Sequence, residues 1–88
     1  FFCSGDIFAL ELMKYLKSLG KKAKRDYGIM GFDNIDVLDY VTPRLTTIDN
    51  SVEKIAIMAV NMLFDLINGK TTRTEILLDY LLVEGETI

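Results

Sequence analysis

Hydrophobic residues in this chain fall into short continuous runs that alternate with longer helical stripes. The central run, residues 27–34, holds the bulky side chains of Ile29, Met30 and Phe32 and ends on the carboxylate of Asp33. A run this short, with polar residues at both ends, predicts a buried strand of a parallel sheet. Ligands of open α/β sheets bind beyond the carboxyl ends of such strands. Asp33 is therefore a candidate ligand-binding residue.

The first helical stripe follows Gly5 and covers residues 7–19. Asp6 stands where a side-chain acceptor can cap the first turn of a helix, and Gly20 is a typical C-terminal stop. Apolar residues occur on more than one side of this segment. We therefore expect a helix that is covered on two sides.

A second stripe covers residues 52–67 and ends at Asn68 and Gly69. Asn50 and Glu53 have the spacing of a capping box ahead of it. The apolar residues recur at helical spacing and predict one buried face.

The remaining segments complete an alternating order of elements. A short helix or turn is predicted at 35–41, and further strands at 1–4, 45–48 and 76–83. The order β-α-β-(short α)-β-α-β predicts an α/β fold of parallel strands joined by helical crossovers.

Composition narrows the possible functions. A net charge of −3 and a pI near 4.8 argue against a nucleic-acid surface in this segment. One cysteine and no histidine exclude a disulfide framework, a zinc site and a histidine-based triad within the 88 residues. The sequence contains neither the phosphate-loop motif G-x-x-x-x-G-K-[ST] nor the dinucleotide-binding motif G-x-G-x-x-G. We expect no enzyme activity, metal site, cofactor or membrane span, and we interpret a chain that begins inside an apolar run without methionine as part of a longer protein.

Two predicted strand ends carry carboxylates, at Gly5-Asp6 and at Asp33-Asn34. If these strands are neighbours, both loops open on one crevice. An ionised aspartate there can accept hydrogen bonds from adjacent hydroxyls or from an N–H pair, which suits a sugar or a nucleobase. For Asp6, helix capping alone is a sufficient explanation.

Some apolar residues lie outside the main stripes. They suit a subunit contact, or a surface that further parts of the same protein cover, and the sequence leaves both readings open. These residues are Leu10, Leu38, Tyr40 and Val41.

Three segments together resemble successive signatures of the LacI/GalR family of bacterial transcription regulators. They are CSGDIFALELMKYLKSLG at 3–20, YGIMGFDN at 27–34 and YVTPRLTTID at 40–49. The resemblance implies a type I periplasmic-binding-protein-like fold with two α/β subdomains around a ligand cleft. Residues 1–44 and 75–88 would belong to the C-terminal subdomain and residues 45–69 to the N-terminal one, with the DNA-binding head absent from this chain.

The resemblance also implies residue roles. Asp33 matches the aspartate with which family members bind effector, and we expect Gly5, Asp6 and Asn34 to share its site. Gly5 stands where many sugar-responsive members have an asparagine, and purine-responsive members tolerate glycine there. The four apolar residues above, Leu10, Leu38, Tyr40 and Val41, match positions on or near the family's dimer interface.

The function that the resemblance implies is the ligand-sensing part of a cytoplasmic repressor. Its partners would be a small effector (a sugar or sugar derivative, or else a nucleobase), a second copy of the protein, and operator DNA bound through the head. A soluble sugar-binding receptor of the same fold, serving transport or chemotaxis, is the alternative.

Overall fold

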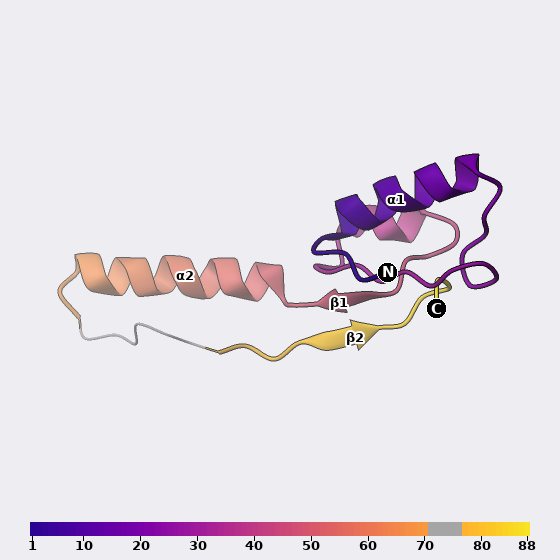
Figure 1. The fold of residues 1–88 in the computed structure, drawn as a ribbon. Helices are drawn as coiled ribbons and strands as arrows, with labels where there is room; N and C mark the ends of the chain where they lie inside the picture. The colour runs from indigo at the N-terminus through magenta and orange to yellow at the C-terminus, as the bar shows by residue number, and fades with distance from the viewer. Residues whose placement is uncertain (71–76) are drawn as a thin grey trace.

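The computed structural model describes residues 1–70 and 77–88. The elements in chain order are α1 (Asp6–Ser18), the 3-10 helix η1 (Asp36–Tyr40), β1 (Thr47–Asp49), α2 (Val52–Ile67) and β2 (Leu81–Val83). Figure 1 shows a compact half, which holds α1, η1 and both termini, and an arm that ends in α2. The molecule is elongated as a result, with extents of 58 × 19 × 18 Å.

Helix α1 forms where its stripe predicts and buries Ala9 and Met13. It ends as predicted at Gly20, whose φ of +77° is the left-handed conformation that glycine adopts without strain. The start differs from the prediction. Gly5 is the N-cap residue and no side chain caps the helix, because Asp6 already lies inside the first turn.

The predicted parallel arrangement of the first strands is confirmed, although the paired segments are short. Met30 forms one parallel bridge to Phe2 and another to Thr46. The backbone N–H of Cys3 donates to the carbonyl of Met30 at 2.9 Å, which fixes the first pairing. Strands over the whole of 1–4 and 27–34 are too long a prediction, because Phe2 is the one bridged residue in the first segment and Tyr27 and Met30 are those in the second.

The last strand corrects the prediction of an all-parallel order. β2 pairs with β1 in antiparallel register, with Thr47 opposite Val83. The chain leaves the compact half along β1, passes through α2 and returns along β2, so the two strands run in opposite directions (Figure 1). The predicted start of this strand, Ile76, lies outside the described residues.

The C-terminal residues are fastened back into the compact half. The hydroxyl of Thr87 donates to the carbonyl of Ile29 at 2.7 Å and accepts from the backbone N–H of Thr46 at 2.9 Å. Gly85 passes so close to the backbone of Arg44 and Leu45 that a Cβ atom would collide with it. Position 85 therefore accommodates only glycine, because any other residue would bring its Cβ atom into this neighbouring backbone.

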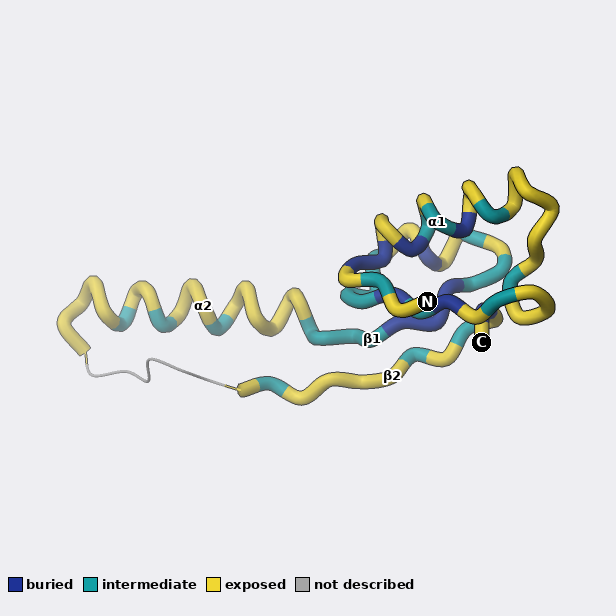
Figure 2. The backbone as a smooth tube through the Cα atoms, viewed as in Figure 1, coloured by how far each residue is buried: buried dark blue, intermediate teal, exposed yellow. Residues whose placement is uncertain are grey.

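Buried residues concentrate in the compact half (Figure 2). The core consists of Ala9, Met13, Ile29, Leu38 and Leu45. Helix α2 has no buried residue, which corrects the prediction of a buried face there. The described residues contain nothing that packs over α2, so its apolar side chains stay exposed. Within the same residues, no helix has the length and apolar character that a bilayer crossing requires.

Candidate functional site

Asp6 lies in the interior of the compact half, only 1% exposed. Its Oδ1 accepts a hydrogen bond from the hydroxyl of Thr47 at 2.6 Å, and its Oδ2 accepts one from the backbone N–H of Ile35 at 2.8 Å. The carboxylate thus ties α1 to β1 and to the residue that precedes η1. This corrects two expectations, because Asp6 neither caps α1 nor presents surface to a ligand.

Asp33 lies at the end of the central strand, half-buried, with a left-handed φ of +115°. Its backbone N–H donates to the carbonyl of Ile48 at 2.8 Å, and its Oδ1 accepts from the side-chain amide of Asn50 at 3.1 Å. Gly5 faces the same carboxylate, since a Cβ atom on Gly5 would lie 4.0 Å from Asp33 Oδ2. The two predicted strand ends are therefore neighbours. A Cβ atom on Gly5 would also lie 3.4 Å from the ring of Phe8, and Asp33 Oδ2 accepts no hydrogen bond among the described residues.

Asn34 has hydrogen-bond partners for both polar atoms of its amide. Its Nδ2 donates to Asp49 Oδ2 at 3.2 Å, and its Oδ1 accepts from Arg44 Nη2 at 3.2 Å. Arg44 also forms an ion pair with Asp39 at 2.7 Å. Asn34 thus joins the strand end to the segments around β1, with its amide already engaged.

Asp49 closes this polar network next to α2. The backbone N–H of Ser51 donates to Asp49 Oδ1 at 2.8 Å. The pKa of the Asp49 carboxyl lies below its ordinary value. The hydrogen bond from the Ser51 N–H is the largest cause of this lowering, and the hydrogen bond from the Asn34 amide is the next.

Asn50 is a site residue that sequence reasoning assigned to another role. The capping box predicted with Glu53 is absent, because Ser51 is the N-cap residue and no side chain caps α2. The Asn50 amide instead contacts Asp33, and its Oδ1 is buried without a hydrogen-bond partner among the described residues. The two residues are 17 positions apart, so no local sequence signal points to this pair.

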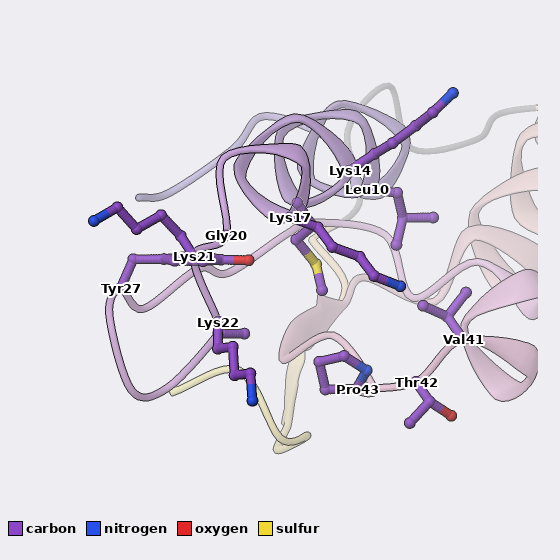
Figure 3. Close-up of a pocket in the computed structure, with 12 residues that line it drawn as sticks. Leu10, Lys14, Lys17, Gly20, Lys21, Lys22, Tyr27, Val41, Thr42 and Pro43 are labelled. Carbon is purple, nitrogen blue, oxygen red and sulfur yellow. The ribbon is translucent and has the colours of Figure 1, made fainter.

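A separate cleft of about 640 Å³ lies between α1 and the segment 41–43 (Figure 3). Leu10 and Val41 line it, whereas none of the four predicted effector-binding residues does. Lysines at 14, 17, 21 and 22 also line the cleft, and Lys17 reaches from α1 toward Val41. The sequence reading did not single out these lysines as a group around an apolar hollow.

The four residues predicted at the subunit contact have different surroundings. Leu38 is fully buried and belongs to the core, so it is not available to a partner. Tyr40 is 86% exposed. Leu10 and Val41 are half-buried at the cleft.

The whole chain, residues 1–88, matches the model of the periplasmic binding protein-like domain. The chain belongs to this domain family. Its similarity to transcription repressors covers most of the chain. The chain is 36% identical over 78 residues to the probable HTH-type transcriptional repressor ExuR of Bacillus subtilis, which is 89% of this chain and 23% of that protein. It is also 36% identical over 76 residues to the repressor PurR of Serratia proteamaculans, covering 86% of this chain and 22% of the repressor.

Solved structures of LacI-family regulators have the same fold as this chain. A regulator from Enterococcus faecium with bound ribose superposes with a TM-score of 0.91 and 30% identity. A periplasmic binding protein/LacI regulator from Alkaliphilus metalliredigens, complexed with D-xylulofuranose, gives 0.91 and 33%. Each match covers 98% of this chain and 33% of the other. The expected α/β, periplasmic-binding-protein-like fold and the resemblance to LacI-type regulators are confirmed.

Proposed function

We propose that this domain is the ligand-sensing part of a longer LacI/GalR-type repressor that binds a small effector through Asp33. The chain spans about a quarter of the curated repressors that it matches. In this proposal residues 1–44 and 75–88 belong to one subdomain, and the chain crosses to the other within residues 45–69. Leu45 still packs in the core of the compact half and Thr46 pairs with Met30, whereas α2 lies outside that half. The separation of α2 from the compact half supports that division (Figure 1).

The observation that carries the proposal is the position of the Asp33 carboxylate. It lies at a strand end, half-buried, and only one of its oxygens, Oδ1, accepts a hydrogen bond among the described residues. A carboxylate in that position accepts hydrogen bonds from hydroxyl or N–H pairs. The sugars held by two solved relatives have such hydroxyls. The proposed effector is a sugar or sugar derivative, with a nucleobase as the second chemical class.

The proposed action is binding and not catalysis. Effector that binds one subdomain arrangement more tightly than the other shifts the population toward it and thereby changes operator affinity. Operator DNA would be bound by a head outside this chain, and the repressor would act in the cytoplasm. The curated relatives are repressors, which favours this reading over a receptor for transport or chemotaxis.

The proposed repressor is a homodimer whose contact includes Leu10, Tyr40 and Val41. The exposure of Tyr40 and the apolar lining of the neighbouring cleft support this surface. Leu38 is left out because the core encloses it.

Thermal unfolding of the full-length protein in the presence of candidate effectors tests the proposal. The panel contains D-ribose, D-xylulose, sugar phosphates, inosine and guanine. A ligand at about 100 times its Kd stabilises the folded state by about 2.7 kcal/mol, which raises Tm measurably. We expect one chemical class to raise Tm of the wild type and to leave Asp33→Ala unchanged.

The matched control is Asp36→Ala, which removes an exposed aspartate three residues farther along. It should respond to effector like the wild type. An equal response of Asp33→Ala would show that Asp33 does not bind effector. A wild type that no panel member stabilises would contradict the sensor function itself.

A further inference from the structure

Asn50 connects two parts of the molecule that the chain separates. It lies between β1 and α2, where the backbone leaves the compact half (Figure 1). Asp33 lies at the strand end inside that half. The hydrogen bond from Asn50 Nδ2 to Asp33 Oδ1, 3.1 Å long, spans this boundary.

The orientation of the Asn50 amide follows from the chemistry of its partner. A carboxylate accepts hydrogen bonds, so the NH2 group of the amide must face Asp33. The carbonyl oxygen then points into protein, where it is buried without a partner in the described part of the chain. Such an acceptor costs free energy that an apolar side chain of the same shape would avoid.

The backbone around this bond is also unfavourable. Asp33, Asn34 and Ser51 all have positive φ, at +115°, +59° and +57°. Strained residues and unpaired polar atoms persist at functional sites, where geometry matters more than stability. Their coincidence around one hydrogen bond indicates that the bond is kept for the orientation it gives Asp33.

We propose that Asn50 is a positioning residue that holds the Asp33 carboxylate in the orientation that binds effector. This inference rests on the proposed function. The amide occupies Oδ1, so Oδ2, the oxygen on the Gly5 side, is left without a hydrogen bond among the described residues and in this proposal receives the donors of the ligand. The same bond links effector binding at Asp33 to the segment that leads into α2.

Two substitutions of Asn50 in the full-length protein test this role, with D-ribose, D-xylulose, inosine and guanine as probes. Asn50→Leu has nearly the same shape but removes both the hydrogen bond and the unpaired oxygen. We expect Tm of its ligand-free form to equal or exceed that of the wild type, while Kd measured by calorimetry rises about tenfold, the loss of roughly one hydrogen bond. Asn50→Asp sets a second carboxylate against Asp33 and should weaken binding further than Asn50→Leu.

The measurements of Tm and Kd together separate a positioning role from a structural one, because loss of a positioning residue raises Kd without lowering Tm. A structural Asn50 would lower Tm in Asn50→Leu and leave Kd of the folded protein unchanged, which would overturn the inference. Asn61→Leu, an exposed asparagine on α2, is the matched control and should not alter Kd. If probes bind the wild type and Asn50→Asp with equal Kd, the positioning role is wrong while the sensor function stands. If no probe binds the wild type, the proposed function fails and this inference with it.

Discussion

At the scale of single residues, the two aspartates at the strand ends have opposite environments. Asp6 is enclosed, and the Thr47 hydroxyl and Ile35 N–H use both of its oxygens. Asp33 is half-buried, and only its Oδ1 accepts a hydrogen bond among the described residues. The same side chain after two neighbouring strands therefore stabilises the fold in one case and is the proposed effector-binding group in the other.

Replacing Asp6 by alanine should destabilise the fold strongly. Two donors, one of them the Ile35 N–H that cannot rotate toward another partner, would be left without their acceptor. Each unsatisfied buried donor costs about 1–3 kcal/mol, so Asp6→Ala should lower the free energy of unfolding by about 2–6 kcal/mol. Asp6→Asn should cost less, because its amide can still accept from Ile35 and donate to the Thr47 hydroxyl.

Urea unfolding of the full-length protein measures this effect. Asp36→Ala, at an exposed aspartate, should change the unfolding free energy by less than about 0.5 kcal/mol. An unfolding curve of Asp6→Ala that coincides with that of the wild type would show that the two hydrogen bonds of Asp6 contribute nothing to stability.

At the scale of elements, the junction between β1 and α2 depends on side chains outside the helix. Ser51 is the N-cap of α2 but makes no side-chain cap bond. Asp49 instead accepts a hydrogen bond from the backbone N–H of Ser51, two residues farther along the chain. Aspartate side chains readily form such turns. The carboxylate of Asp49, which can be protonated, therefore helps to fix the turn from β1 into α2.

Acid should weaken this junction. The folded state lowers the pKa of Asp49, so the folded state holds its proton less tightly than the unfolded chain. The stabilisation is then present above the unfolded pKa near 3.8 and is lost as pH falls through the lower, folded value. Hydrogen exchange at the Ser51 N–H should accelerate over that acidic range, beyond the intrinsic change with pH.

Asp49→Asn removes the titration at this position. Its Ser51 exchange, corrected for intrinsic rates, should show no step over the same range. A step of equal size in Asp49→Asn and in the wild type would assign the acid sensitivity to another group.

At the scale of the whole molecule, the chain has a packed half and an uncovered arm. The core residues all lie in the compact half, whereas α2 is apolar and exposed (Figure 2). Exposed apolar faces of this size indicate contacts with further protein. The proposed subdomain division supplies a cover for α2, and the proposed dimer supplies one for the surface around Tyr40.

Tyr40→Glu should weaken the dimer of the full-length protein. Tyr40 is 86% exposed, so a charge there leaves the core intact but must be desolvated in the proposed contact. We expect the dimer dissociation constant to rise about tenfold or more, measured by sedimentation equilibrium.

Tyr15→Glu is the matched control for this measurement. Tyr15 is 61% exposed and lies about 140° around α1 from Leu10, away from the proposed contact. It should sediment like the wild type. Equal dissociation constants for Tyr40→Glu and the wild type would exclude Tyr40 from the interface.

Local patterns of the sequence by themselves determined α1 with its stop at Gly20, the parallel order of the first three strand segments, and the position of Asp33 at a strand end. Each rests on periodicity or on a residue type within a few positions. Tertiary structure alone decided the antiparallel return of β2, the burial of Leu38, and the partners of Asp6 and Asp33. Thr47 meets Asp6 across 41 positions and Asn50 meets Asp33 across 17. No local pattern encodes such pairs, because they form only when separate segments pack against one another.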